Sequence, residues 1–197
     1  MSDTTQTPGW PLDRARTVAE KLRAELLEFC DKIEIVGSIR RARPFVGDID
    51  FVLLCREGAR PALERRVGKN PSTRILRNGR ENMAFVLANG MQVDLFFATP
   101  AVNDLAGYIP GNFGMRMLAM TGSKEHNIFL TKQANARGCH FHPYRGLMRG
   151  GYYAALPEGG REYRGGEVFA SEEELTIFKE LGLGWVPPEQ REIDAKS

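Results

Sequence analysis

The chain has 197 residues, of which 42% are hydrophobic and 26% are charged, and its formal net charge is +2 at pH 7. This length and composition allow one domain or two small subdomains with buried cores. No apolar run approaches the roughly 18 residues that span a bilayer, and residues 1–10 lack the apolar core of a signal peptide. We therefore expect a cytoplasmic protein that does not span a membrane.

Charge is unevenly distributed along the chain. Residues 1–150 carry 22 Lys and Arg against 15 Asp and Glu, whereas residues 151–197 carry 5 against 10. The basic portion suits contact with phosphates, although a merely solvated surface is the alternative.

The first predicted elements are a helix and a strand that leads into a glycine turn. Residues 11–29 place their apolar side chains on one helical stripe. A strand at about 33–37 follows, and Gly37 lets the backbone turn and approach a ligand without a Cβ in the way. Ser38 then opens a short helical turn whose N–H groups, hydroxyl and guanidinium groups form a phosphate cradle. The guanidinium groups come from Arg40, Arg41 and Arg43.

The next strand, at about 48–55, carries two carboxylates on one face. Side chains alternate along a strand, so Asp48 and Asp50 face one way while the apolar residues between and after them face the other. Their Cα atoms lie about 6 to 7 Å apart, which allows the carboxylates to converge on shared cations. Crowded carboxylates repel one another, and a hard divalent cation such as Mg²⁺ removes that penalty.

A helix at about 59–69 and a hairpin come next. The hairpin pairs residues 73–77 with residues 82–88 through an Asn78-Gly79 turn. With the strands around it, this hairpin predicts one mixed sheet.

A third carboxylate lies in the apolar strand at 91–97. Strands disfavour Asp, and a buried carboxylate without a partner is costly, so Asp94 is expected beside Asp48 and Asp50. A salt-bridged Asp at a strand end is the alternative.

The second half of the chain is predicted to mix helices and short strands. The elements are a partly helical stretch at 104–120, a helix at 123–137 that stops at Gly138, strands at 139–144 and 147–155, and a helix that a capping box at Ser171–Glu174 opens and that runs to Leu181. Tyr152, Tyr153, Tyr163 and Trp185 are expected to complete the core of this part, with base stacking as the alternative.

The order of these motifs resembles that of family X DNA polymerases, the relatives of polymerase beta. The match consists of Gly37-Ser38, Asp48-x-Asp50, Val93-Asp94-Leu95, Thr121-Gly122-Ser123 within TGSKEHNIFLTKQANARG, and the closing WVPPEQRE at 185–192. It covers the chain from about residue 12 to residue 192.

The resemblance implies an α+β fold in which a nucleotidyltransferase palm, a mixed sheet flanked by helices, precedes a small α/β thumb. The palm is expected at 11–105 and the thumb, for nucleotide and DNA binding, at 106–197. Residues 1–10 are expected to be disordered or extended. The lyase and helix-hairpin-helix modules of larger family members are expected to be absent.

The resemblance also implies roles for individual residues. Asp48 and Asp50 would bridge two Mg²⁺ ions, and Asp94 would hold the catalytic ion, with Mn²⁺ as the other candidate metal. The nucleotide would be bound by a second set of residues. The outer phosphates would be contacted by Ser38, Arg41 and Gly47, beside Gly37. The turn beneath the sugar corresponds to Gly122 and Ser123. Lys124 falls where the base would stack, and Asn127 matches a residue at the minor-groove edge of the base.

Two departures from the family pattern stand out. Ala119-Met120 replaces the aromatic pair that usually precedes the Thr-Gly turn. Gln92 replaces the basic residue two positions before the third carboxylate, so a contact that assists this carboxylate or the primer is expected to be missing.

These observations predict a DNA-directed DNA polymerase that adds dNMP to a primer 3′-hydroxyl by two-metal catalysis, in short gap filling during DNA repair. Its expected partners are primer-template or gapped DNA and a dNTP, and the protein is expected to be a monomer. Two alternatives stay open: a nucleotidyltransferase that works without a template or on a small molecule, and a non-catalytic DNA-binding module.

Overall fold

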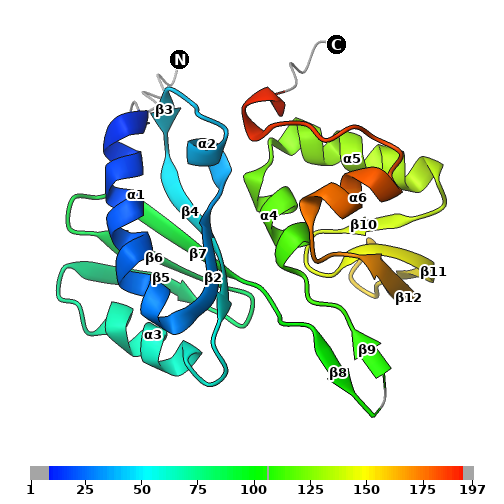
Figure 1. The fold of residues 1–197 in the computed structure, drawn as a ribbon, viewed down its shortest axis with the longest axis horizontal. Coiled ribbons are helices and arrows are strands. Elements are labelled where there is room, and N and C mark those ends of the chain that lie inside the picture. The colour runs from blue at the N-terminus through cyan, green and yellow to red at the C-terminus, as the bar shows by residue number, and fades with distance from the viewer. Residues whose placement is uncertain (1–8, 106, 193–197) are drawn as a thin grey trace. The chain divides into compact units, whose positions relative to one another are not determined.

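The structure is a computed structural model that describes residues 9–105 and 107–192 (Figure 1). The chain divides into two compact units, residues 1–97 and 98–197. The prediction of a disordered or extended segment at 1–10 falls mainly on residues outside the described ranges. No helix within the described ranges is both long and apolar enough to cross a bilayer.

The first unit is built on a five-stranded sheet. Its strand order is β2-β4-β7-β6-β5, and β4 pairs with β7 in parallel while the other neighbours are antiparallel. The strands are β2 (Cys30–Ile35), β4 (Asp48–Cys55), β5 (Thr73–Asn78), β6 (Asn82–Leu87) and β7 (Gln92–Phe97). The mixed sheet that the sequence predicts is therefore present.

Helices and a short strand pair complete this unit. They are α1 (Leu12–Leu26), the 3₁₀ turn η1 (Leu27–Phe29), α2 (Gly37–Arg40), α3 (Arg60–Gly68), and β1 (Trp10–Pro11) paired with β3 (Phe45–Val46). Ala15, Ala19 and Leu26 of α1 are buried in the same cluster as Ile49, Phe51 and Leu53 of β4. The apolar face of β4 is thus committed to the core, which leaves the alternate residues for chemistry.

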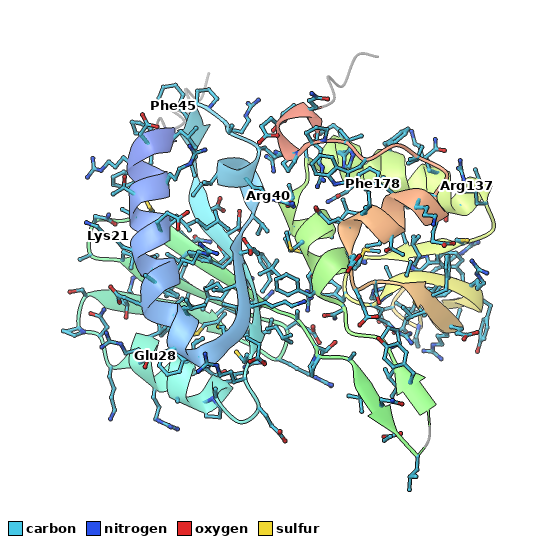
Figure 2. All side chains as sticks on the ribbon, viewed as in Figure 1. Lys21, Glu28, Arg40, Phe45, Arg137 and Phe178 are labelled. Atoms are coloured by element: carbon cyan, nitrogen blue, oxygen red, sulfur yellow. The ribbon has the colours of Figure 1, made fainter. Side chains whose placement is uncertain are left out.

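The second unit has an α/β arrangement of its own. Its elements are the hairpin β8 (Val102–Asp104) and β9 (Gly107–Ile109), helices α4 (Phe113–Thr121), α5 (Lys124–Ala136) and α6 (Glu174–Glu180), the sheet β10 (His140–His142), β11 (Gly146–Ala155) and β12 (Arg161–Ala170), and the 3₁₀ turn η2 (Pro188–Gln190). Met115, Leu130 and Phe178 belong to its separate core. Figure 2 labels Phe178 on α6. The predicted α+β fold class is confirmed for the described residues.

The boundary between the units lies earlier than the predicted palm boundary after residue 105. Backbone N–H of Asn112 donates to the Thr99 carbonyl at 3.2 Å, and the Asn112 side-chain oxygen accepts from the Thr99 N–H at 2.7 Å. The chain after Phe97 is therefore tied to the second unit.

The prediction of a partly helical stretch at 104–120 is confirmed, because this stretch begins as a hairpin and continues as a helix from Phe113. The strand β12 was not predicted. The predicted capping box at Ser171 does not form, because the Ser171 hydroxyl donates to the Gly111 carbonyl at 2.7 Å and α6 starts at Glu174.

Candidate active site

Two neighbouring parallel strands bring three carboxylates together. Asp50 on β4 and Asp94 on β7 are direct partners in the parallel register, and Asp48 lies two residues before Asp50 on the same face. One carboxylate oxygen from each residue lies within 4.8 Å of one from each of the others. Oxygen donors at this spacing suit a hard divalent cation.

Asp94 is held in place by two side chains. It is only 5% exposed. Gln92, two residues before it on β7, donates from Nε2 to Oδ2 of Asp94 at 2.6 Å, and Arg77 on β5 donates from Nη2 to Oδ1 at 3.1 Å. Gln92 therefore does contact the third carboxylate, although it lacks a charge, and Arg77 supplies the cation from a different strand.

Sequence reasoning missed Arg77. The signal was the hairpin around Asn78-Gly79, because cross-strand pairing places Arg77 opposite Ala84 and Ala84 opposite Asp94. The alternation of side chains along β5 was not enough to predict which face of the sheet Arg77 lies on. The register of the strands was unknown, and the pairing is irregular between Ile75 and Arg77.

The negative charges of the three carboxylates repel one another. Burial and the nearby Asp48 and Asp94 raise the pKa of Asp50 to about 8, while Arg41 acts in the opposite direction. Burial and Asp94 also raise the pKa of Asp48. Divalent cations would relieve this repulsion, so the donor set fits the two Mg²⁺ ions that the sequence predicts, and Mn²⁺ takes the same class of donors.

Gly37 leaves space for one of these carboxylates. Its φ of +61° lies in the left-handed region, and a Cβ there would overlap the Asp50 carboxylate. Only glycine therefore allows the turn into α2 and an undisturbed Asp50 at the same time.

The neighbouring predicted phosphate ligands lie in the same unit. The Ser38 hydroxyl oxygen is buried and has no hydrogen-bond partner among the described residues. Gly47 directly precedes Asp48, and a Cβ built on it would meet no atom within 4 Å. Arg41, which follows α2, is near enough to act on the pKa of Asp48 and of Asp50. The last residue of α2 is Arg40, labelled in Figure 2.

The other predicted nucleotide-binding residues lie together at the junction of α4 and α5 in the second unit. Gly122 ends α4 with a φ of +72°. Ser123 accepts the His126 N–H at 3.2 Å as the cap of α5 and donates its hydroxyl to the Arg191 carbonyl at 2.7 Å. Ser123 therefore has a structural role in this state.

Lys124 and Asn127 differ in their surroundings. Lys124, the first residue of α5, is exposed. The Asn127 side-chain nitrogen donates to the Ala119 carbonyl at 2.7 Å, and its oxygen is buried without a hydrogen-bond partner in the described part of the chain. The Asn127 side chain therefore uses its donor within the protein and leaves its acceptor unsatisfied.

The closing WVPPEQRE segment is anchored by a buried arginine. Arg191 is fully buried, and it donates to the Glu174 carboxylate and to the Val186 carbonyl, both at 2.9 Å. Its carbonyl also receives the Ser123 hydroxyl. The segment therefore fixes the start of α5, a function that the sequence motif alone did not reveal.

Comparisons with known proteins match this architecture. A model of the DNA polymerase beta thumb matches residues 116–192. The chain is 26% identical over 192 residues to DNA polymerase/3′-5′ exonuclease PolX of Bacillus subtilis strain 168, in an alignment that covers 95% of this chain and 29% of that protein. The chain thus spans less than a third of the length of this curated relative.

Two solved structures of Leishmania infantum polymerase beta have the same fold. The ternary P/T complex matches with a TM-score of 0.69 and 20% identity, covering 93% of this chain and 77% of that one. The ternary gap complex matches with a TM-score of 0.72 and 20% identity, covering 95% of this chain and 72% of that one. The chain is thus similar to family X polymerases, and its residues 116–192 match the model of the polymerase beta thumb.

Proposed function

We propose that the chain is a DNA-directed DNA polymerase that adds dNMP to a primer 3′-hydroxyl. The observation that carries this proposal is the group of three carboxylates on two adjacent strands, with oxygens within 4.8 Å of one another. Three carboxylates this close repel one another unless cations are bound between them. Bound cations would also offset the negative charge that develops during phosphoryl transfer.

The reaction would join the primer 3′-oxygen to the α-phosphorus of the dNTP and break the bond to the β-phosphate, releasing pyrophosphate. Asp48 and Asp50 would hold both Mg²⁺ ions, and Asp94 would hold the one nearer the primer. When bound, the ions lower the pKa of the 3′-hydroxyl and offset the charge of the leaving phosphates.

The protein's own residues would orient these groups. Gln92 and Arg77 hold the Asp94 carboxylate in one orientation, so its oxygens are fixed before substrate arrives. With this support, Asp94 can receive the proton of the 3′-hydroxyl. The negative charge that develops on the 3′-oxygen would then be near the guanidinium of Arg77, which contacts Asp94.

The first unit would also bind the triphosphate. The buried Ser38 hydroxyl needs a partner, and a phosphate oxygen can supply one. Gly37 and Gly47 let the backbone approach the phosphates, and Arg41 would contribute charge-assisted hydrogen bonds.

In the second unit, we assign sugar contact to Gly122 and Ser123, base stacking to Lys124, and base-edge contact to Asn127. The vacant acceptor of Asn127 supports the last assignment. Further parts of the proposal are short gap filling in DNA repair, a monomeric state and a cytoplasmic location. The names of the structural neighbours, which include a ternary gap complex of polymerase beta, support the gapped substrate.

A substrate panel tests the proposal. The protein is incubated with Mg²⁺ or Mn²⁺ and with either dNTPs or rNTPs, on gapped duplex, recessed primer-template and unpaired primer. The proposal expects template-directed addition of dNMP that is fastest on the gapped duplex. Untemplated tails on the unpaired primer, or binding without addition on all three, would reject it.

A further inference from the structure

Figure 1 shows the three-stranded sheet β10-β11-β12 of the second unit. Residues of this sheet and of its loops line an open groove. Its volume is about 740 Å³, and its walls include the rings of His140, His142, Tyr144, Tyr153 and Tyr163. The expectation that Tyr153 and Tyr163 complete the core is therefore wrong. Tyr153 in particular is 50% exposed.

Tyr163 is held in the groove by a glycine on the next strand. Its ring lies against Gly151, where a Cβ would come within 2.5 Å of the ring carbons. The Gly151 N–H donates to the Tyr163 hydroxyl at 3.0 Å, and the ring stacks on His140 with centroids 4.0 Å apart and planes inclined by 15°. The sheet thus fixes this ring before any ligand binds.

Tyr153 is fixed in a second way. It is the cross-strand partner of Tyr163, and the two rings meet edge to face with centroids 5.3 Å apart. Its hydroxyl lies 2.8 Å from Nδ1 of His140. The polar tip of Tyr153 is therefore satisfied inside the cluster while half of its surface faces solvent.

Charged side chains border these rings. Arg145 and Arg161 line the groove, together with Glu158 and Glu162. Glu162 is paired with Arg164 at 3.0 Å, which offsets its charge. Exposed aromatic rings next to arginines are the combination that binds unpaired nucleic-acid strands, because every base has a face that can stack and every nucleotide carries a phosphate.

We propose that this groove binds a single strand of nucleic acid, with a base stacked on Tyr153 and a backbone phosphate contacted by Arg161. Binding is independent of base sequence because the groove contacts a ring face and a phosphate. The proposal goes beyond the polymerase activity, since it needs neither the three carboxylates nor a primer. It would give the protein a second binding site, for the unpaired strand that accompanies a gap or an overhang.

The strand β11 provides matched controls. Tyr152 is 63% exposed and adjacent to Tyr153, but alternation places it on the opposite face of β11, where its cross-strand partner is Arg164. Neither Tyr152 nor Arg164 lines the groove. The groove variants Tyr153→Ala and Arg161→Ala can therefore be compared with Tyr152→Ala and Arg149→Ala, because Arg149 of β11 is exposed and lies outside the groove, whereas Arg164 is paired with the groove residue Glu162.

The test measures binding of fluorescent oligothymidine and oligouridine by anisotropy, with the full chain, in EDTA and at several salt concentrations. Tyr153→Ala should weaken binding about fivefold or more, whereas Tyr153→Phe, which keeps the ring, should stay within about twofold of wild type. Arg161→Ala should reduce the slope of log affinity against log salt by about 0.7. The two control variants should change neither quantity, and thermal unfolding should show that all variants fold.

Loss confined to the groove variants, with either oligonucleotide, supports the proposal and identifies which type of strand binds. Equal losses in both pairs, or unchanged binding in Tyr153→Ala and Arg161→Ala, would overturn it and leave the groove for a peptide or another ligand. Because the assay contains neither a primer nor divalent cations, its result is independent of whether the chain extends DNA.

Discussion

Arg77 on β5 donates from Nη2 to Oδ1 of Asp94 on β7 at 3.1 Å, across the intervening strand β6. Asp94 is almost completely buried, whereas the Arg77 side chain is about half exposed. The pair therefore joins a carboxylate that has little water around it to a cation that reaches it from the sheet edge. Arg77 holds Oδ1 of Asp94 while Gln92 holds Oδ2, so the two contacts together fix the orientation of the carboxylate.

Replacing Arg77 should slow extension without unfolding the protein. Arg77→Ala leaves Asp94 with only the hydrogen bond from Gln92 among the two side-chain contacts described above, so the orientation of its carboxylate is less restricted. The single-turnover rate should therefore fall about tenfold, which corresponds to about 1.4 kcal/mol. Arg77→Lys keeps the charge but loses the planar guanidinium and should recover part of the rate.

Arg74 on the same strand is the control for Arg77. It is exposed, and Arg74→Ala should leave the rate within about twofold of wild type. Equal rates for Arg77→Ala and Arg74→Ala would show that the Arg77 contact does not assist the reaction.

Gly37→Ala should disable the metal site through a steric effect. The new Cβ would overlap the Asp50 carboxylate, so we expect the rate of primer extension to fall by about two orders of magnitude. The Mg²⁺ concentration that gives half of the maximal rate should rise. The matched control is Gly58→Ala. Gly58 has a similar φ of +69° but no atom within 4 Å of a built Cβ.

Both alanine variants incur the cost of a left-handed conformation, about 1 kcal/mol of stability. Calorimetry should therefore show a loss of about this size in Gly58→Ala and at least as large a loss in Gly37→Ala, and a rate assay should show a defect in Gly37→Ala alone. A comparable catalytic defect in Gly58→Ala would attribute the effect to backbone strain.

The stability of the metal-free protein should fall as pH rises toward 8. Folded Asp50 keeps its proton up to about pH 8, since burial and the neighbouring carboxylates raise its pKa from 3.8, whereas the unfolded chain releases it near pH 4. The folded state therefore binds more protons between these pH values, and stability decreases as pH increases across that window. Because Asp50 is partly exposed, screening reduces the effect to on the order of 2 kcal/mol.

Thermal unfolding in EDTA measures this effect. Asp50→Asn should remove much of the pH dependence between pH 5 and pH 8, and Mg²⁺ should stabilise the wild type more at pH 8 than at pH 5. A wild-type protein in EDTA that is equally stable at both pH values would contradict the assigned electrostatics.

His126 should make the second unit sensitive to acid. Burial, with a further contribution from Arg191, lowers its pKa to about 4, and neither ring nitrogen has a hydrogen-bond partner among the described residues. The unfolded chain binds a proton near pH 6.5 and the folded chain near pH 4, so stability is lost as pH falls through this interval, by about 2 kcal/mol.

His126→Phe should remove that loss. The ring packs near Phe129 and Phe178, with centroids 6.4 Å and 5.9 Å away, so an apolar ring suits the site. The variant should match or exceed the wild-type melting temperature at pH 7.5 and exceed it clearly at pH 5. A variant that is less stable than wild type at pH 5 would show that the imidazole has a partner it needs.

Local alternation was enough to predict which face of β4 carries Asp48 and Asp50, because that pattern depends on period two alone. The position of Asp94 beside them followed from its unusual place in an apolar strand. Arg77 could not be predicted in the same way, since its contact depends on the register of three strands and on an irregularity between Ile75 and Arg77.

The second half of the chain was harder to predict for a related reason. The strand β12 contains Gly165 and Gly166, which interrupt its alternation, and the groove exists because Gly151 gives room to the ring of Tyr163. The packing of a ring against a glycine on a neighbouring strand leaves no local pattern in the sequence. Ser123 illustrates the same limit, because its hydroxyl bonds to the carbonyl of the distant Arg191.

The most direct test of the central claim is the single-turnover rate of primer extension by Asp94→Asn on gapped DNA. Asn keeps the shape of Asp but removes a charge and a proton acceptor, so the rate should fall by about 10³-fold or more while binding of Mg²⁺ and dNTP stays measurable. Asp31→Asn, an exposed carboxylate of the same unit, should leave the rate unchanged. Extension by Asp94→Asn at a rate near that of the wild type would contradict the account.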